Sequence, residues 1–284
     1  MENLIFHACE TFLFADDIFL LFKGDRDKPM LFENNVNGCL NSVLQWTITN
    51  SLSINPLKTK AIMFGSVDNS FDHINPHLGG VSIEVFSRLR CLGIILDCEL
   101  SFSYHADLIS GKVWGILRRI YSTNIYLPFR VKVKLAHALL MPQILYGLEV
   151  ISGSSVETLE KLKRIMNMIA RFVFNVRRWD HISSYVHKFL GCSFLNFVKF
   201  RNLILFFHII KNGFPFPLVN KFEFLRSTRN PQIFIPRIYR LSFERSFVVR
   251  IARCWNYLPY ELRIFSHSNN VFRLKLLKYF ADHT

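Results

Sequence analysis

The stretch Thr11–Phe22, TFLFADDIFLLF, places two adjacent aspartates between two short apolar runs. Residues 11–14 and 18–22 consist mainly of Phe, Leu and Ile, and runs of this kind favour strands. Ala15, Asp16 and Asp17 separate the runs, so the stretch predicts a β-hairpin with a carboxylate pair at its turn. A pair of acidic residues in a turn is usually only solvated. Between two buried strands, however, it would present oxygen ligands of the kind that Mg²⁺ prefers.

The residues that follow the hairpin up to about residue 100 predict one helix and several further strands. A helix is expected over 31–48, because Phe32, Val36, Leu40, Val43 and Leu44 fall on one face, with Ile48 as a further candidate. A turn at Asn55-Pro56 leads into a strand over 61–64 that Gly65 stops. Residues 66–80 are polar and predict a loop, and residues 81–85 and 89–96 predict a pair of strands that ends at Asp97.

From residue 103 the apolar residues recur at the spacing of helices. Helices are expected from 103 to about 120 and from 129 to 140, where Pro142 interrupts the second, with a resumption over 144–151. Ser154 and Glu157 have the spacing of a capping box at the start of the next helix. Further helices are expected over 196–211, 245–257 and 270–280. The fold class is therefore α+β, with strands and one helix first and helices afterwards.

Several blocks of this sequence resemble, in order, those of non-LTR reverse transcriptases. Phe14-Ala15-Asp16-Asp17 resembles the F/Y-A-D-D signature of that family, and LSINPLKTK (52–60) resembles its next block, an Asn-x-x-Lys-Thr run before a strand. LGIILD (92–97) resembles a family block that forms a hairpin near the primer end. The basic helix around 112–119 stands where the family's thumb begins, and CWNYLP (254–259) resembles a C-terminal Trp-Asn-x-Leu-Pro run.

The resemblance implies an incomplete polymerase palm at 1–102, a helical thumb at 103–190 and a basic, mainly helical C-terminal region at 191–284. It implies an RNA-directed DNA polymerase, a nucleotidyltransferase, that uses Mg²⁺ held by Asp16 and Asp17 as catalytic metal ligands. The further residues that it implies are Phe14, Ala15 and Lys58 for nucleotide binding, and Gly93, Lys112, Arg118 and Arg119 for binding the primer.

Simpler structural roles exist for several of these residues. Lys58 fits a solvated turn about as well as a phosphate contact, and Gly93 fits a bulge inside a strand. Asn55 fits the turn before Pro56, and Trp255 fits a core anchor better than a base-stacking platform.

The charge distribution points to a polyanionic partner. Residues 1–170 hold 16 Lys+Arg and 16 Asp+Glu, whereas residues 171–284 hold 19 and 5, so the whole net charge of +14 arises in the second part. Nucleic acid, here an RNA template and a DNA primer, is the partner that best explains such asymmetry. An ordinary basic surface that keeps the chain soluble is the alternative.

The composition excludes several other classes of protein. Half of the residues are hydrophobic, which excludes a disordered tail, and the six cysteines lack zinc-finger spacing and fit reduced thiols in a nuclear or cytoplasmic protein. The most apolar stretch, Leu203–Ile210, is far shorter than the roughly 20 residues of a membrane span. The first ten residues lack the features of a signal peptide.

Part of the expected catalytic machinery has no counterpart in this sequence. The family's first catalytic Asp lies well upstream of the ADD turn, but 15 residues precede Asp16 and the acidic ones among them are Glu2 and Glu10. We therefore expect a fragment that is inactive alone, with the other polymerase half and an endonuclease domain as missing partners. The competing hypotheses are a non-catalytic nucleic-acid-binding remnant and a helical interaction protein with an accidental ADD.

Overall fold

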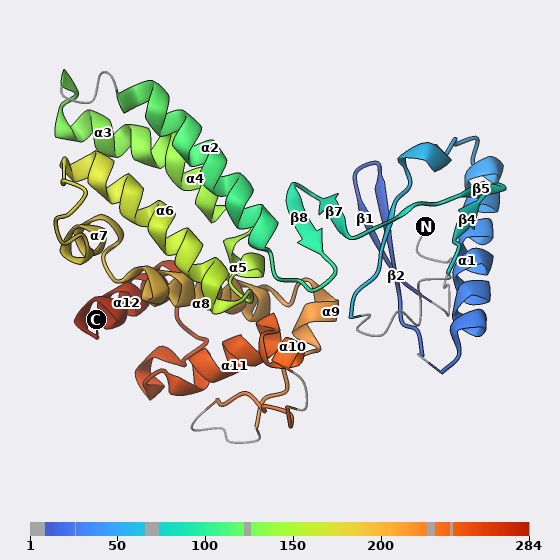
Figure 1. Ribbon diagram of the computed structural model, residues 1–284. Helices are drawn as coiled ribbons and strands as arrows, with labels where there is room; N and C mark the ends of the chain where they lie inside the picture. Colours follow the sequence, from blue (N-terminus) through green and yellow to red (C-terminus); the bar gives the residue numbers. More distant parts are fainter. Residues whose placement is uncertain are drawn as a thin grey trace. The chain divides into compact units, whose positions relative to one another are not determined.

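The computed structural model describes residues 9–25, 27–65, 74–121, 126–225, 231–238 and 241–283. It contains two compact units, Met1–Ser101 and Phe102–Thr284, and each is described by itself (Figure 1). The first unit combines short strands with one long helix and the second is helical, so the predicted α+β class is confirmed. The division lies one residue from the boundary expected at 102. The second unit continues across residue 190, where a further boundary had been expected.

The first unit begins with the predicted hairpin. Strands β1 (Cys9–Phe14) and β2 (Asp17–Phe22) pair antiparallel, with Phe14 opposite Asp17. Helix α1 (Pro29–Thr49) follows and confirms the predicted helix. Val36 and Leu40 of α1 form a small core with Leu78 and Ile83, against which Phe22 packs.

The remaining strands of the first unit do not form the single antiparallel sheet expected of a palm. The strands of the described residues form four separate two-stranded pairs, and one of these is parallel. After the short 3₁₀ turn η1 (Pro56–Lys58), the elements are β3 (Ala61–Ile62), β4 (His77–Leu78), β5 (Val81–Ser82), β6 (Val85–Phe86), β7 (Arg88–Cys91) and β8 (Ile94–Asp97).

The predicted pairing of residues 81–85 with 89–96 is wrong. Strand β5 pairs with β4, and β6 runs parallel to β3. Residues 89–96 instead fold back on themselves, because Leu92 and Gly93 adopt φ values of +44° and +85° and turn β7 into β8. Positive φ at both central residues is the signature of a tight hairpin turn, so Gly93 occupies a turn and not a bulge within a strand.

The second unit begins with five helical segments that pack around apolar faces. Helix α2 (Ser103–Tyr121) buries Ile109, Val113 and Leu117. The next helices are α3 (Phe129–Leu135), α4 (Met141–Leu145), α5 (Leu148–Ile151) and α6 (Val156–Phe174), and α6 packs along α2.

Pro142 does not interrupt the helical conformation between α3 and α4, contrary to the prediction. Residues Ala136–Leu140 form a π-helical turn that connects the two helices, and Pro142 lies at the start of α4. A π turn widens the helix by one residue and thereby relieves the clash that a proline ring makes with the preceding turn. The predicted helix at 144–151 is divided, because Gly147 adopts a left-handed conformation with φ of +69°.

The cap of α6 lies one residue later than the sequence predicted. Ser155, and not Ser154, is the N-cap, and its Oγ accepts a hydrogen bond of 3.3 Å from Thr158 N. Ser154 is buried, and the one-residue shift places Glu157 one position too early for a capping box.

The rest of the second unit is built on α8 (Phe194–Asn212), whose aromatic side chains contribute to a hydrophobic core. Trp255 is fully buried there, its ring lies 4.8 Å from that of Phe265 and 5.0 Å from that of Phe206, and its Nε1 donates to Pro231 O. The interpretation of Trp255 as a core anchor is thereby confirmed. The other elements are α7 (Ser183–Leu190), α9 (Phe216–Val219), α10 (Leu241–Glu244), α11 (Phe247–Tyr257), η4 (Tyr260–Leu262) and α12 (Asn269–Asp282).

One apolar stretch among the described residues, 183–212, is long and apolar enough to cross a membrane when judged by length and composition alone. It comprises α7 and α8, which meet at Gly191. This is weak evidence for a span, because core helices pass the same test, and α8 contributes Phe206 and Phe207 to the core described above. The finding is consistent with the expectation of no membrane span.

Candidate functional site

The two aspartates lie at the tip of the β1–β2 hairpin and are exposed to solvent. Ala15 and Asp16 form a two-residue loop, in which Ala15 has a φ of +50°. A positive φ at the first central position is typical of tight hairpin turns with glycine at that position, and it strains an alanine. Both carboxylates therefore project from a narrow turn with a defined backbone.

The strands beside the turn are more exposed than the sequence predicted. Leu13 and Phe14 are 49% and 61% exposed, and only β2 reaches the small core, through Leu20 and Phe22. The reason is that, among the described residues, the hairpin is a sheet of only two strands, so no further strand covers the outer edge of β1. The expectation of a turn between two buried strands is thus wrong for β1.

The β7–β8 hairpin is electrostatically linked to the aspartate turn. Burial raises the pKa of the Cys91 thiol, and the negative charge of Asp17 raises it further. Because that effect requires proximity, Asp17 and the end of β7 lie near each other. The Leu92–Gly93 turn directly follows Cys91, so the structure brings two of the sequence-predicted elements, the aspartate pair and Gly93, into one region.

The residues around the aspartates supply only part of a magnesium site. Mg²⁺ takes six oxygen ligands, several of which are water, but a metal pair requires more than two adjacent carboxylates. Within the described ranges, no group of three His, Cys, Asp or Glu side chains is arranged to hold a metal. Glu10 is at the far end of the hairpin, where it pairs with Lys23 at 2.5 Å. Asp16 and Asp17 by themselves would therefore provide only some of the six oxygen ligands of a Mg²⁺ ion.

Lys58 lies in a capped turn after α1. Asn55 Oδ1 accepts a hydrogen bond of 3.0 Å from Leu57 N and so caps the 3₁₀ turn η1, which confirms the predicted role of Asn55. Lys58 ends that turn and is exposed. Within the described residues it forms no ion pair with Asp16 or Asp17.

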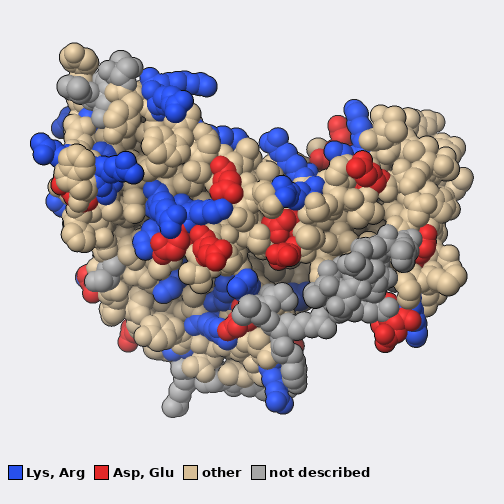
Figure 2. Space-filling view, in the orientation of Figure 1, with Lys and Arg blue, Asp and Glu red and all other residues tan. Residues whose placement is uncertain are grey.

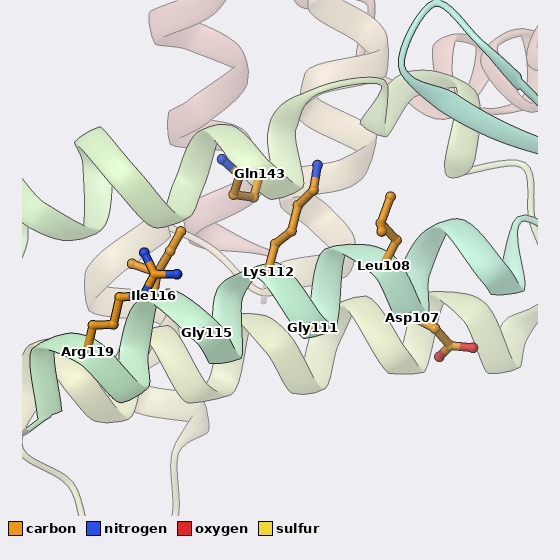
Figure 3. Close-up of a pocket in the computed structure, with 8 residues that line it drawn as sticks. All are labelled: Asp107, Leu108, Gly111, Lys112, Gly115, Ile116, Arg119 and Gln143. Atoms are coloured by element: carbon orange, nitrogen blue, oxygen red, sulfur yellow. The ribbon is translucent and has the colours of Figure 1, made fainter.

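In the second unit, a groove of about 660 Å³ runs between α2 and α4 (Figure 3). Lys112 and Arg119 of α2 line it together with Gln143 of α4. Gly111 and Gly115 also line it, and a Cβ atom added at either glycine would meet open space. The glycines therefore leave the backbone of α2 accessible between two cationic side chains.

The charges in the groove favour an anionic ligand. Asp107 also lines it, but its carboxylate is engaged by Lys161 at 2.8 and 3.0 Å. Neither Lys112 nor Arg119 has an ion-pair partner within the part of the chain that the structure describes. Arg118, which the resemblance placed with them, is exposed but does not line the groove, because successive helical residues point about 100° apart.

The charge of the chain divides at the boundary between the units. Residues 1–101 hold 7 Lys+Arg and 12 Asp+Glu, a net charge of −5, whereas residues 102–284 hold 28 and 9, a net charge of +19. Figure 2 shows many Lys and Arg side chains over the helices α2, α3 and α6. The positive excess of the second unit therefore includes helices α2, α3 and α6 and is not confined to the last 114 residues.

Sequence reasoning missed the role of Gln143 and of the two glycines in the groove. Gly111 and Gly115 are four residues apart and therefore lie on one face of a helix, which is a signal visible in the sequence. Gln143 carries no such signal, because its position depends on the π turn that aligns α4 with α2.

Comparison of the chain with protein-family models, with curated proteins and with solved structures found no match.

Proposed function

We propose that this chain is part of an RNA-directed DNA polymerase of the non-LTR retrotransposon kind, with Asp16 and Asp17 as ligands of catalytic Mg²⁺. The observation that carries the proposal is the exposed carboxylate pair on a strained two-residue turn, with the Leu92–Gly93 hairpin nearby. Strain held at an exposed turn is typical of functional sites. The ordered sequence blocks described above provide independent support.

In this proposal the first unit is an incomplete palm. Its described strands form separate pairs, and β1 exposes large apolar side chains beside an edge that no other described strand covers. Such an edge readily accepts another strand. A further segment that pairs with the hairpin would bury this surface and would add the carboxylate that the metal site needs. Phe14 and Ala15 at the turn and Lys58 are proposed to contact the incoming nucleotide, and Gly93 the primer.

The second candidate function is nucleic-acid binding without catalysis. It is favoured by the α2–α4 groove, where Lys112 and Arg119 flank accessible helix backbone, and by the net charge of +19 of the second unit. Cations in such a groove neutralise phosphates, and most of the resulting affinity comes from the release of counterions. The same groove would hold the template–primer duplex in the polymerase.

Primer extension on a primed RNA template with Mg²⁺ tests the first proposal. The parent chain is compared with the double variant Asp16→Asn, Asp17→Asn, and with the matched control Asp25→Asn, Asp27→Asn, which changes two exposed carboxylates of the same unit. The assay is run with and without a supplied upstream palm segment of a related polymerase. Extension that the control retains and the active-site variant loses supports catalysis by Asp16 and Asp17.

The same samples distinguish the remaining alternatives. Absence of extension under all conditions, together with salt-sensitive binding of the template, contradicts the polymerase proposal and leaves the binding function. Absence of both extension and binding contradicts both functions and favours a helical interaction protein.

A further inference from the structure

The turn between α6 and α7 carries the most exposed tryptophan of the chain. Trp179 is 79% exposed, whereas Trp114 is 54% exposed, Trp46 is half-buried and Trp255 is fully buried. A tryptophan normally contributes its large apolar surface to a core or an interface, so a ring that is left in solvent needs an explanation.

The backbone that carries Trp179 is held in one conformation. Asp180 N donates to Arg177 O at 3.2 Å, which closes a β-turn with Arg178 and Trp179 at its tip. The carboxylate of Asp180 accepts from Arg177 N at 3.2 Å and ties the turn from the other side. A turn closed in both directions loses little further backbone entropy when its tip binds a ligand.

Arg171 of α6 fastens this turn to the body of the unit. Its guanidinium donates to the carbonyl oxygens of both Arg177 and Asp180, the second at 3.0 Å. The base of the turn is fixed as well, because Asn175 adopts a left-handed conformation and both Asn175 N and Val176 N donate to Arg171 O. Hydrogen bonds from the Arg171 side chain therefore fix the backbone of the turn that carries the exposed Trp179.

The charged residues of the turn are two arginines and Asp180, whose carboxylate accepts a hydrogen bond from Arg177 N. Arg177 and Arg178 are exposed, and neither guanidinium has an ion-pair partner among the residues that the structure describes. Val176 and Ile182, the apolar residues on either side of the turn, are half-buried. The exposed ring of Trp179 thus directly follows two exposed arginines in the sequence.

We propose that Trp179 stacks on an unpaired base of single-stranded nucleic acid while Arg178 binds a neighbouring phosphate. An aromatic ring next to a cationic side chain is the arrangement by which proteins bind single strands without sequence preference, because every base has a π face. The proposal rests on nucleic-acid binding by the second unit, as argued above, and adds to it a contact that distinguishes single strands from duplexes.

A lipid membrane is the other partner that an exposed tryptophan can bind. Insertion into a lipid interface requires a continuous apolar face around the ring. The α6–α7 turn has no such face, since the apolar residues beside it are half-buried and its tip is Arg178-Trp179. The observations therefore favour the nucleic acid.

Fluorescence anisotropy with the full chain and a labelled oligothymidylate of 20 nucleotides tests the proposal. Loss of one stacked base is expected to weaken binding roughly 5- to 150-fold in Trp179→Ala. Trp179→Phe should recover most of the affinity, because its ring still stacks. Tyr257→Ala is the matched control, since Tyr257 is 84% exposed in the same unit.

Two further probes separate stacking from charge. An oligonucleotide of the same length with abasic sites throughout should bind the parent and Trp179→Ala equally, and so should a duplex. Arg178→Ala should instead weaken all three probes and lower the log–log salt slope by about 1.

The outcomes distinguish this proposal from the function on which it rests. If Lys112→Ala with Arg119→Ala weakens binding while Trp179→Ala binds oligothymidylate as tightly as the parent, the stacking site is overturned and the binding function stands. If the parent binds no nucleic acid, both are overturned. Anionic lipid vesicles that bind the parent but not Trp179→Ala, with unchanged oligonucleotide binding, would assign Trp179 to a membrane instead.

Discussion

A buried hydroxyl group connects residues 103–190 of the second unit with the basic residues 191–284. Ser152 follows α5 and is 5% exposed. Its Oγ accepts from Arg250 Nη1 of α11 at 2.8 Å and from Asn202 Nδ2 of α8 at 3.0 Å, and it donates to Glu149 O at 2.9 Å. Arg250 Nη2 also donates to Glu149 O, at 3.2 Å. Residues on both sides of position 190 therefore share one polar network.

The substitution Ser152→Ala removes this oxygen and takes one hydrogen-bond acceptor from Asn202 Nδ2 and one from Arg250 Nη1. A buried neutral donor that loses its partner costs about 1–3 kcal/mol, and a donor on a charged group costs more. Asn202 keeps its bond to Val198 O, and Arg250 keeps its bonds to Glu149 O and Arg245 O, which limits the loss. We expect the free energy of unfolding to fall by about 3 kcal/mol in total.

Local packing prevents the backbone from adjusting to the substitution. A Cβ atom on the neighbouring Gly153 would lie 2.7 Å from Arg245 O, so the two segments are already in close contact. For a unit of this size, a loss of about 3 kcal/mol corresponds to a fall in Tm of roughly 6–12 °C.

Urea unfolding followed by far-UV circular dichroism and by tryptophan fluorescence measures the effect. All four tryptophans contribute to the fluorescence, and among them Trp255 reports on the C-terminal core, whereas circular dichroism reports on all helices. The control is Ser184→Ala, because Ser184 is an exposed serine on α7, where a change within about 0.5 kcal/mol is expected. A loss below 1 kcal/mol in Ser152→Ala, or separate transitions for residues 103–190 and 191–284, would refute the reasoning.

Three further predictions concern the groove, the hairpin and a buried thiol. Lys112→Ala with Arg119→Ala should lower the log–log salt slope of nucleic-acid binding by about 1.5, measured by anisotropy titration in KCl, and an unchanged slope would exclude the groove as the contact. Ala15→Gly relieves the left-handed backbone at φ +50° and should stabilise the first unit by about 0.5–1 kcal/mol in urea unfolding, whereas a destabilised variant would show that the turn is not strained. Burial and the adjacent Cys9 thiol raise the pKa of Cys39 from 9.0 to about 12. The stability that this thiol provides should be complete below pH 9 and be lost as the pH rises to 12, and Cys39→Ala should flatten that part of the pH profile of unfolding.

Local patterns in the sequence located several of the helices but not all of them. The predictions at 31–48, 196–211 and 270–280 correspond to α1, α8 and α12 within two residues at each end, whereas α7 was not predicted. The helix at 31–48 was predicted because its apolar residues fall on one face, which must be buried. The β1–β2 hairpin was also predictable, since a two-residue turn between two apolar runs allows one pairing. The carboxylate pair at its tip followed directly from that pairing.

Pairing between distant segments, by contrast, was decided by the tertiary structure. Strand β6 lies beside β3 and not beside its neighbour in sequence, and nothing local distinguishes the two arrangements. Gln143 of α4 and Lys112 of α2 are far apart in the sequence and line the same groove only because the two helices meet in the folded unit.

The same limit applies to the exposed side chains. Trp179 and Trp255 both have an arginine within two positions in the sequence, but only the packed chain shows that Trp255 is fully buried and Trp179 is exposed. Apolar spacing along one helix specifies which residues face inward. The partner that each face or turn meets is specified by contacts between segments far apart in the chain, because burial is a property of the assembled core and not of the local sequence.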